Sequence, residues 1–64
     1  MSNTIATYRD PYGYGATIRM NKGSNLYELI IFTNGKNVFR NKYTSRAGAR
    51  KAMNRFSDIW DRIA

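Results

Sequence analysis

Hydrophobic and polar residues alternate along the middle of the chain in the way that antiparallel strands require. Ala16 to Met20 alternates with a period of two, which is typical of a half-buried strand. Leu26 to Thr33 is rich in β-branched and aromatic residues and predicts a second strand. The pair Asn34-Gly35 favours a two-residue type I′ turn, because both residue types tolerate positive φ. We therefore expect Lys36 to Asn41 to be the third strand of a meander.

After residue 43 the apolar residues recur at helical spacing, which predicts a helix over 44–63. Thr44 or Ser45 can cap its first turn, because a side-chain hydroxyl can accept a hydrogen bond from a free amide there. The apolar stripe spans an arc of about 120° and should pack on the sheet, with Trp60 as its main anchor. Its members are Ala49, Ala52, Met53, Phe56, Ile59, Trp60 and Ile63.

Residues 1–15 are less regular and predict an irregular arm or an edge strand. Pro11, Gly13 and Gly15 interrupt this segment, because proline fixes φ and glycine admits positive φ. Tyr12 and Tyr14 have two interpretations. They form either a flexible aromatic arm that stacks on bases or a partner, or a lid folded over the sheet.

Together these patterns predict one α+β domain over 1–64. The elements follow the order β-β-β-α along the chain. They form a three- to four-stranded antiparallel sheet with one C-terminal amphipathic helix packed on one face. The segments are an arm or edge strand over 1–15, a β-meander over 16–41 and a helix over 44–63.

The strand Leu26–Thr33 is apolar on both faces, and one helix can cover only one of them. Glu28 marks the even-numbered face as the outer one, where Ile30 and Phe32 would lie near Arg19 and Arg40. Basic residues beside an aromatic ring on an open sheet are suited to single strands. A chain of 64 residues buries little surface, so we expect a homodimer through this face, or an N-terminal segment folded over it.

The composition excludes several classes of protein. The chain has no cysteine and no histidine, which excludes disulfides and the usual zinc sites and removes the commonest catalytic base and nucleophile. With only four carboxylates we expect no metal, no cofactor and no enzymatic activity. The longest apolar run is Leu29–Phe32, and the N-terminus lacks the regions of a signal peptide. These features predict a cytoplasmic protein without a membrane partner, in the host cytoplasm if it is viral.

The net charge of +7 is concentrated in one part of the chain. Residues 29–57 include seven basic residues and no acidic one, a pattern that attracts polyanions. The sequence thus predicts a non-catalytic nucleic-acid-binding protein, with RNA or single strands preferred over duplex DNA. The expected contacts are Lys36, Arg40, Lys42, Tyr43, Arg46, Arg50, Lys51 and Arg55, with Phe32, Tyr12 and Tyr14 as stacking or partner contacts.

Two alternatives stay open at this point. The first is a phage-type inhibitor or adaptor that docks its basic face on a host nuclease, polymerase or defence protein, with or without RNA. The second concerns the helix start, where Arg46, Gly48 and free amides form either a phosphate-sized site or three ordinary first-turn residues.

The chain also resembles three known groups of proteins, by local motifs, by element order and by composition. The stretches Tyr27–Phe32, Asn34–Lys36 and Tyr43–Ala49 resemble YegP-like small domains, in which a strand, an Asn-Gly turn, a strand and a Tyr-x-Ser-Lys-Ala-x-Ala helix start recur. That resemblance implies a β-meander with a helix and no particular activity. The element order is similar to the arm-site DNA-binding domain of tyrosine recombinases, although this chain has Lys42-Tyr43 where Gly-Phe is usual. In composition the chain resembles small phage proteins that act on host defence or transcription.

Overall fold

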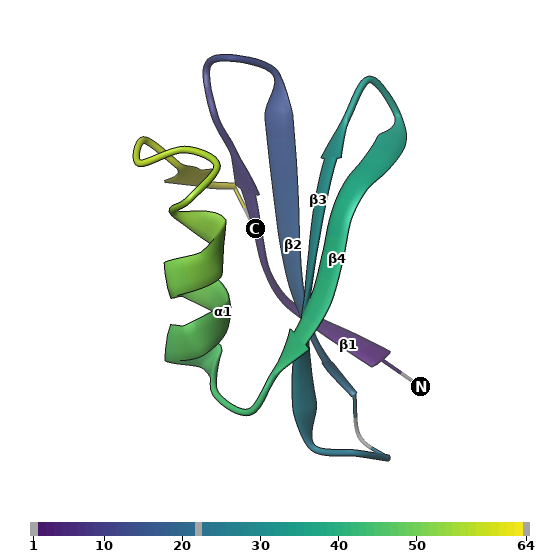
Figure 1. Ribbon diagram of the computed structural model, residues 1–64. Helices are drawn as coiled ribbons and strands as arrows, with labels where there is room; N and C mark the ends of the chain where they lie inside the picture. Colours follow the sequence, from purple (N-terminus) through teal and green to yellow (C-terminus); the bar gives the residue numbers. More distant parts are fainter. Residues whose placement is uncertain (1, 22, 64) are drawn as a thin grey trace.

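The computed structural model describes residues 2–21 and 23–63, and it confirms the α+β fold (Figure 1). An antiparallel sheet of five strands has the order β4-β3-β2-β1-β5, and one short helix packs on one of its faces. We call that side the helix face and the opposite side the outer face. The elements are β1 Ser2–Arg9, β2 Tyr14–Asn21, β3 Leu26–Thr33, β4 Lys36–Tyr43, α1 Arg46–Met53 and β5 Asp61–Arg62.

The N-terminal segment is a full strand of the sheet and not an irregular arm. β1 pairs with β2 along its length, with one irregularity between Thr4 and Ala6. The turn that follows explains this pairing. Asp10 Oδ1 accepts hydrogen bonds from the backbone amides of Tyr12 at 3.1 Å and Tyr14 at 2.8 Å, and Gly13 takes a φ of 97°. Residues that suggested an interruption therefore close a hairpin.

The Asn34-Gly35 turn has the predicted geometry. Both residues have positive φ, 52° for Asn34 and 76° for Gly35, as a type I′ turn requires. It joins β3 to β4, and β4 is an edge strand. The predicted meander of three strands is therefore confirmed as β2, β3 and β4, with two further strands beside it.

The hydrophobic core lies between the sheet and α1. Alternate residues of β2 and β3 belong to this core, because successive side chains of a strand point to opposite faces of the sheet. Ile18 lies opposite Leu29 in the register, and Ala16 lies opposite Ile31. The helix adds Ala49 and, one turn later, Met53. The buried members of the core are Ala6, Tyr8, Ala16, Ile18, Leu29, Ile31, Ala49 and Met53.

The helix ends at Met53, ten positions before the predicted end at residue 63. After it the amides of Arg55 and Phe56 bond to carbonyls three residues back, which tightens the turn. Trp60 then donates its indole N–H to the Met53 carbonyl at 3.0 Å. The Met53 carbonyl thus accepts two hydrogen bonds, from the Phe56 amide and from the indole, and the second holds the tail against the helix end.

The tail that leaves the helix forms β5 against β1, with Asp61 opposite Arg9 (Figure 1). The predicted apolar stripe is therefore wrong beyond Met53. Trp60 packs against the core, as expected, but from the tail and not from a helix. Phe56, Ile59 and Ile63 are exposed.

Candidate nucleic-acid interface

Strand β4 lies at the sheet edge and separates two surfaces that carry basic residues. Its register with β3 places Arg40 opposite Ile30 and Lys42 opposite Glu28, so both cations project from the outer face. The alternate residue Asn41 lies opposite the core and so belongs to the helix face. One edge strand thus has lysine and arginine on one side and faces α1 with the other.

A cleft of about 270 Å³ lies between α1 and β4. We call it the helix–β4 cleft. It is lined by Asn41, Tyr43, Gly48, Lys51, Ala52 and Arg55. Lys51 and Arg55 lie four positions apart, so successive turns bring them to the same side. Gly48 is close-packed there, because a Cβ would lie 3.2 Å from Ser45 Oγ and 3.7 Å from Tyr43 Cβ.

Of the two predicted caps, Thr44 and Ser45, it is Ser45 that caps the helix. Its hydroxyl accepts a hydrogen bond from the Gly48 amide at 3.0 Å. One of the amides that the predicted phosphate site would use is therefore already bonded within the protein. Arg46 lies on the other flank of the helix from Gly48, since each residue advances about 100° around the axis. The structure does not bring these predicted phosphate contacts together.

Two of the four acidic residues are engaged inside the fold. Asp10 is buried at the β1–β2 turn, where it accepts the amide hydrogen bonds described above. Glu28 is also buried and accepts a hydrogen bond from Arg40 Nε at 2.7 Å, the one salt bridge within the described residues. Asp58 and Asp61 lie in the C-terminal tail. No carboxylate is among the described residues that line the helix–β4 cleft.

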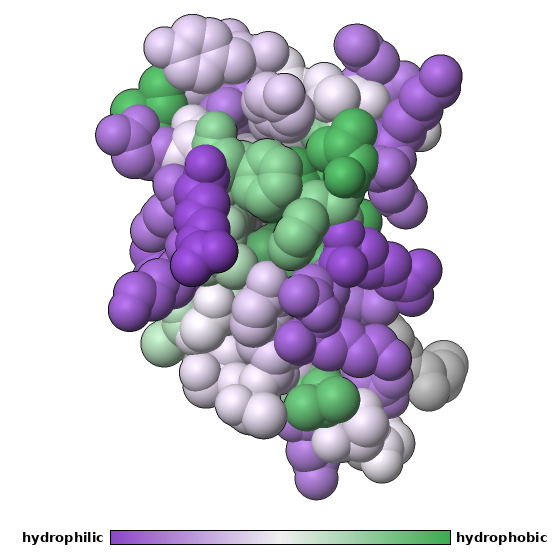
Figure 2. Space-filling view, in the orientation of Figure 1, coloured by the Kyte–Doolittle hydropathy of each residue, from purple (hydrophilic) through white to green (hydrophobic). Residues whose placement is uncertain are grey.

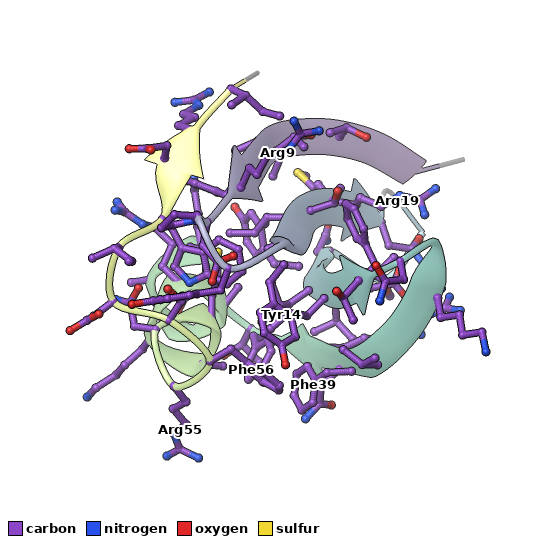
Figure 3. The ribbon with its side chains drawn as sticks, turned by 90° about the horizontal axis from the view of Figure 1, so that it is seen from above. Arg9, Tyr14, Arg19, Phe39, Arg55 and Phe56 are labelled. Carbon is purple, nitrogen blue, oxygen red and sulfur yellow. The ribbon has the colours of Figure 1, made fainter. Side chains whose placement is uncertain are left out.

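The predicted basic contacts divide into two groups. Lys51 and Arg55 face β4, whereas Arg46 and Arg50 lie on the opposite flank of α1, separated from the first pair by the buried face that carries Ala49. The β4 group comprises Lys36, Arg40, Lys42, Lys51 and Arg55, and we call it the β4 basic edge. All of its members are exposed. Figure 3 shows Arg55 extending away from the fold.

The stacking candidates are spread over three surfaces. Phe32 lies on the outer face, opposite Gly15. Tyr14 and Tyr43 are half-buried and pack against the core on the helix face. Tyr12 lies at the tip of the β1–β2 turn and is 77% exposed. Tyr14 therefore covers part of the sheet on its helix face, as the lid interpretation expected, whereas Tyr12 does not.

An aromatic pair that sequence reasoning missed connects the helix end to β4. The rings of Phe39 and Phe56 lie 5.1 Å apart, centroid to centroid, at 56°. Tyr14 lies next to them (Figure 3). Beside the pair, Val38 is half-exposed at a bulge in β4, where it has no register partner. Figure 2 shows the resulting apolar patch, surrounded by hydrophilic side chains. The early helix end, which places Phe56 there, has no simple signal in the sequence.

The outer face has the residues that the sequence predicted for it. Arg19 lies opposite Glu28, next to the pair formed by Thr17 and Ile30. The N-terminal strand extends the sheet and does not fold over this face, which corrects one of the two predicted covers. The other cover, a second copy of the chain, stays a prediction.

No family model, curated protein or solved structure matches this chain. The resemblances to YegP-like and recombinase arm-site domains therefore stay predictions. Within the described residues, no helix is long and apolar enough to cross a membrane. The same residues include no group of three metal-ligating side chains.

Proposed function

We propose that this protein binds nucleic acid without catalysing a reaction, and that the β4 basic edge contacts the phosphates. The observation that carries the proposal is the helix–β4 cleft. Lys51 and Arg55 line it together, and no carboxylate among the described residues lines it with them. Glu28, the nearest acidic residue in the register of β4, is buried and bonded to Arg40. The exposed positive charge is thus left for an external anion.

Binding would proceed by exchange of counterions. Each phosphate that meets a lysine or arginine releases condensed cations from the nucleic acid, which is a favourable entropy change. The Tyr43 hydroxyl and the Asn41 amide, both in the cleft, supply hydrogen bonds to phosphate or sugar. Five contacts between a phosphate and a lysine or arginine predict a slope of log K against log[salt] of roughly −3 to −5. RNA or single strands are expected to bind more tightly than duplex DNA, because an open sheet face suits unpaired bases.

Two double charge reversals test the proposal, one on each flank of α1 and the turn that follows it. Lys51→Glu/Arg55→Glu changes the cleft, and Arg46→Glu/Arg50→Glu changes the opposite flank by the same number of charges. Fluorescence anisotropy with labelled RNA, single-stranded DNA and duplex DNA should show at least a tenfold larger loss for the cleft variant. Circular dichroism checks that both variants fold.

Equal losses for the two variants would mean that net charge alone attracts the polymer. Tight binding that does not change between low and physiological salt would contradict the phosphate mechanism altogether.

A second function is favoured by the apolar patch of Val38, Phe39 and Phe56. A partly exposed aromatic pair beside Arg55 is typical of a protein-docking surface. An inhibitor or adaptor that docks on a host nuclease, polymerase or defence protein would use it. Pull-down after nuclease treatment separates the two functions, since a stoichiometric protein partner survives it and a nucleic-acid ligand does not.

Assembly and location follow as further expectations. A homodimer through the outer face, the predicted cover for that face, is the alternative to its use as a ligand surface; it would join two basic edges and raise the affinity for a long polyanion. Sedimentation at micromolar concentration tests it. The cytoplasm, or the host cytoplasm if the protein is viral, remains the expected location.

A further inference from the structure

The outer face of the sheet is hollowed into a groove of about 270 Å³. Thr4 of β1 and Asn37 of β4 both line it, although β2 and β3 lie between their strands. Neighbouring strands lie ~4.8 Å apart, so on a flat sheet the strands of these two residues would be ~14 Å apart, and their rows in the register are four residues apart as well. The sheet must therefore curl around the groove. Seen from above, the ribbons of β1 and β4 enclose those of β2 and β3 (Figure 3).

The floor of the groove is apolar and its aromatic ring is held in place. Ile30 is 8% exposed, and Phe32 beside it is half-buried. The ring of Phe32 lies over Gly15 on β2, where any side chain would overlap it. A side chain at position 15 would therefore force the Phe32 ring to move.

The walls of the groove are polar and carry one cation. They consist of the hydroxyls of Thr4 and Thr17, the amide of Asn37 and the guanidinium of Arg19. Arg19 faces Glu28 across β2 and β3, but that carboxylate is bonded to Arg40. Arg9 and Lys42 extend from the same face, because their register partners, Gly15 and Glu28, belong to it.

We propose that this groove binds one unpaired nucleobase of a single strand. Phe32 stacks on the base, Asn37 and Thr17 bond to its edge, and Arg19 contacts the adjoining phosphate. The inference rests on the proposed function and adds a second, base-reading site to the phosphate contacts of the β4 basic edge. A base within a duplex is stacked and paired, so the groove selects single strands.

The size and lining of the groove favour a base over other occupants. Its volume lies just below the range of ~300–1,000 Å³ for small-molecule sites, which suits one planar ring system and not a helix. Aromatic floors beside arginine are how sheet surfaces hold unpaired bases. A second copy of this basic face would place like charges against each other.

The test compares Phe32→Leu with Phe56→Leu, the same change in an aromatic residue of the other side of the molecule. The probes are a single-stranded oligonucleotide and an abasic oligonucleotide of the same length and charge. We expect the wild type to prefer the strand with bases. Phe32→Leu should lower the affinity for the strand with bases by about 5- to 150-fold and leave the affinity for the abasic strand unchanged. Phe56→Leu should change neither.

Arg19→Gln provides a second test, which leaves the apolar floor of the groove unchanged. It should reduce the affinity for both oligonucleotides and lower the salt slope by about 0.7, because one phosphate contact is lost. In NMR spectra, nucleoside monophosphate should shift the amide signals of Thr17, Arg19 and Asn37.

Three results would overturn the inference. The first is equal loss of both oligonucleotides in Phe32→Leu, and the second is loss of base preference in Phe56→Leu. The third is that the wild type is a dimer and that Phe32→Leu converts it to a monomer. That result would mean that a second copy of the chain, and not a base, covers the outer face. If the wild type binds neither oligonucleotide, the proposed function itself fails, and the two failures are thereby distinguished.

Discussion

The two faces of strand β3 bury their residues by different means. On the helix face Leu29 and Ile31 are completely buried under apolar side chains of α1 and neighbouring strands. On the outer face Glu28 and Ile30 are also buried, but no helix lies over them. Their neighbours there include Arg19, opposite Glu28, and Arg40, opposite Ile30. Long basic side chains can cover apolar surface with their methylene stems while the charge stays in water.

This difference explains how so small a chain leaves one sheet face open. The register places Arg40 opposite Ile30 and Arg19 opposite the adjacent Glu28, so their stems can shield Ile30, while the ring of Phe32 lies over the backbone at Gly15. A face covered in this way keeps its cations at the surface, where a ligand can reach them. The helix face holds the closed core, and the outer face is the surface to which we assign ligand binding in our proposal.

The largest expected effect separates the two faces directly. Ile31→Ala should lower the free energy of unfolding by about 2–5 kcal/mol, because it leaves a cavity in a closed core. Ile30→Ala should cost about 2 kcal/mol or less, because water and the arginine stems can occupy the space that it leaves. Urea unfolding followed by circular dichroism measures both. Equal losses would mean that the outer face is as tightly packed as the core.

A smaller effect is expected at Gly15, where the outer face is most tightly packed. Gly15→Ala forces the Phe32 ring to move and should cost about 1–3 kcal/mol. In the double variant with Phe32→Ala the overlap disappears, so the combined loss should be smaller than the sum of the single losses. The same urea titrations provide this cycle. Strict additivity would show that the ring does not restrain position 15.

The smallest effect concerns the tail that closes the helix face. Trp60→Phe keeps an aromatic ring but removes the N–H that bonds to the Met53 carbonyl, at a cost of about 0.5–1.5 kcal/mol. The Ile63 amide, which donates to the Thr7 carbonyl at 2.9 Å, should then exchange its hydrogen faster. Tyr12→Phe, at an exposed tyrosine, serves as the control and should leave this rate unchanged. An unaltered rate in Trp60→Phe would mean that β5 forms independently of the indole bond.

Local pattern was sufficient for much of the sheet. The bounds of β3 follow from its run of β-branched and aromatic residues, and the Asn34-Gly35 turn follows from its need for positive φ. The alternation of residues also identified the outer face, with Ile30 and Phe32 near the arginines. Each of these features depends on neighbours in the chain, or on a partner strand that a short turn places beside it.

Residues 1–15 and 44–63 needed the tertiary structure. The helical spacing continues through Phe56 and Ile59, so the pattern alone predicts a long helix. The helix ends at Met53, Trp60 bonds to the Met53 carbonyl, and the tail pairs with β1, a strand more than fifty positions away.

The candidate site divides in the same way. The sequence by itself determined its charge, since the basic run and the scarcity of acidic residues are matters of composition. Only the tertiary structure decided which flank of α1 faces β4, and that the sheet curls into a groove. Those features depend on how the helix crosses the sheet and how the strands twist, and both result from packing between residues that are distant in the chain.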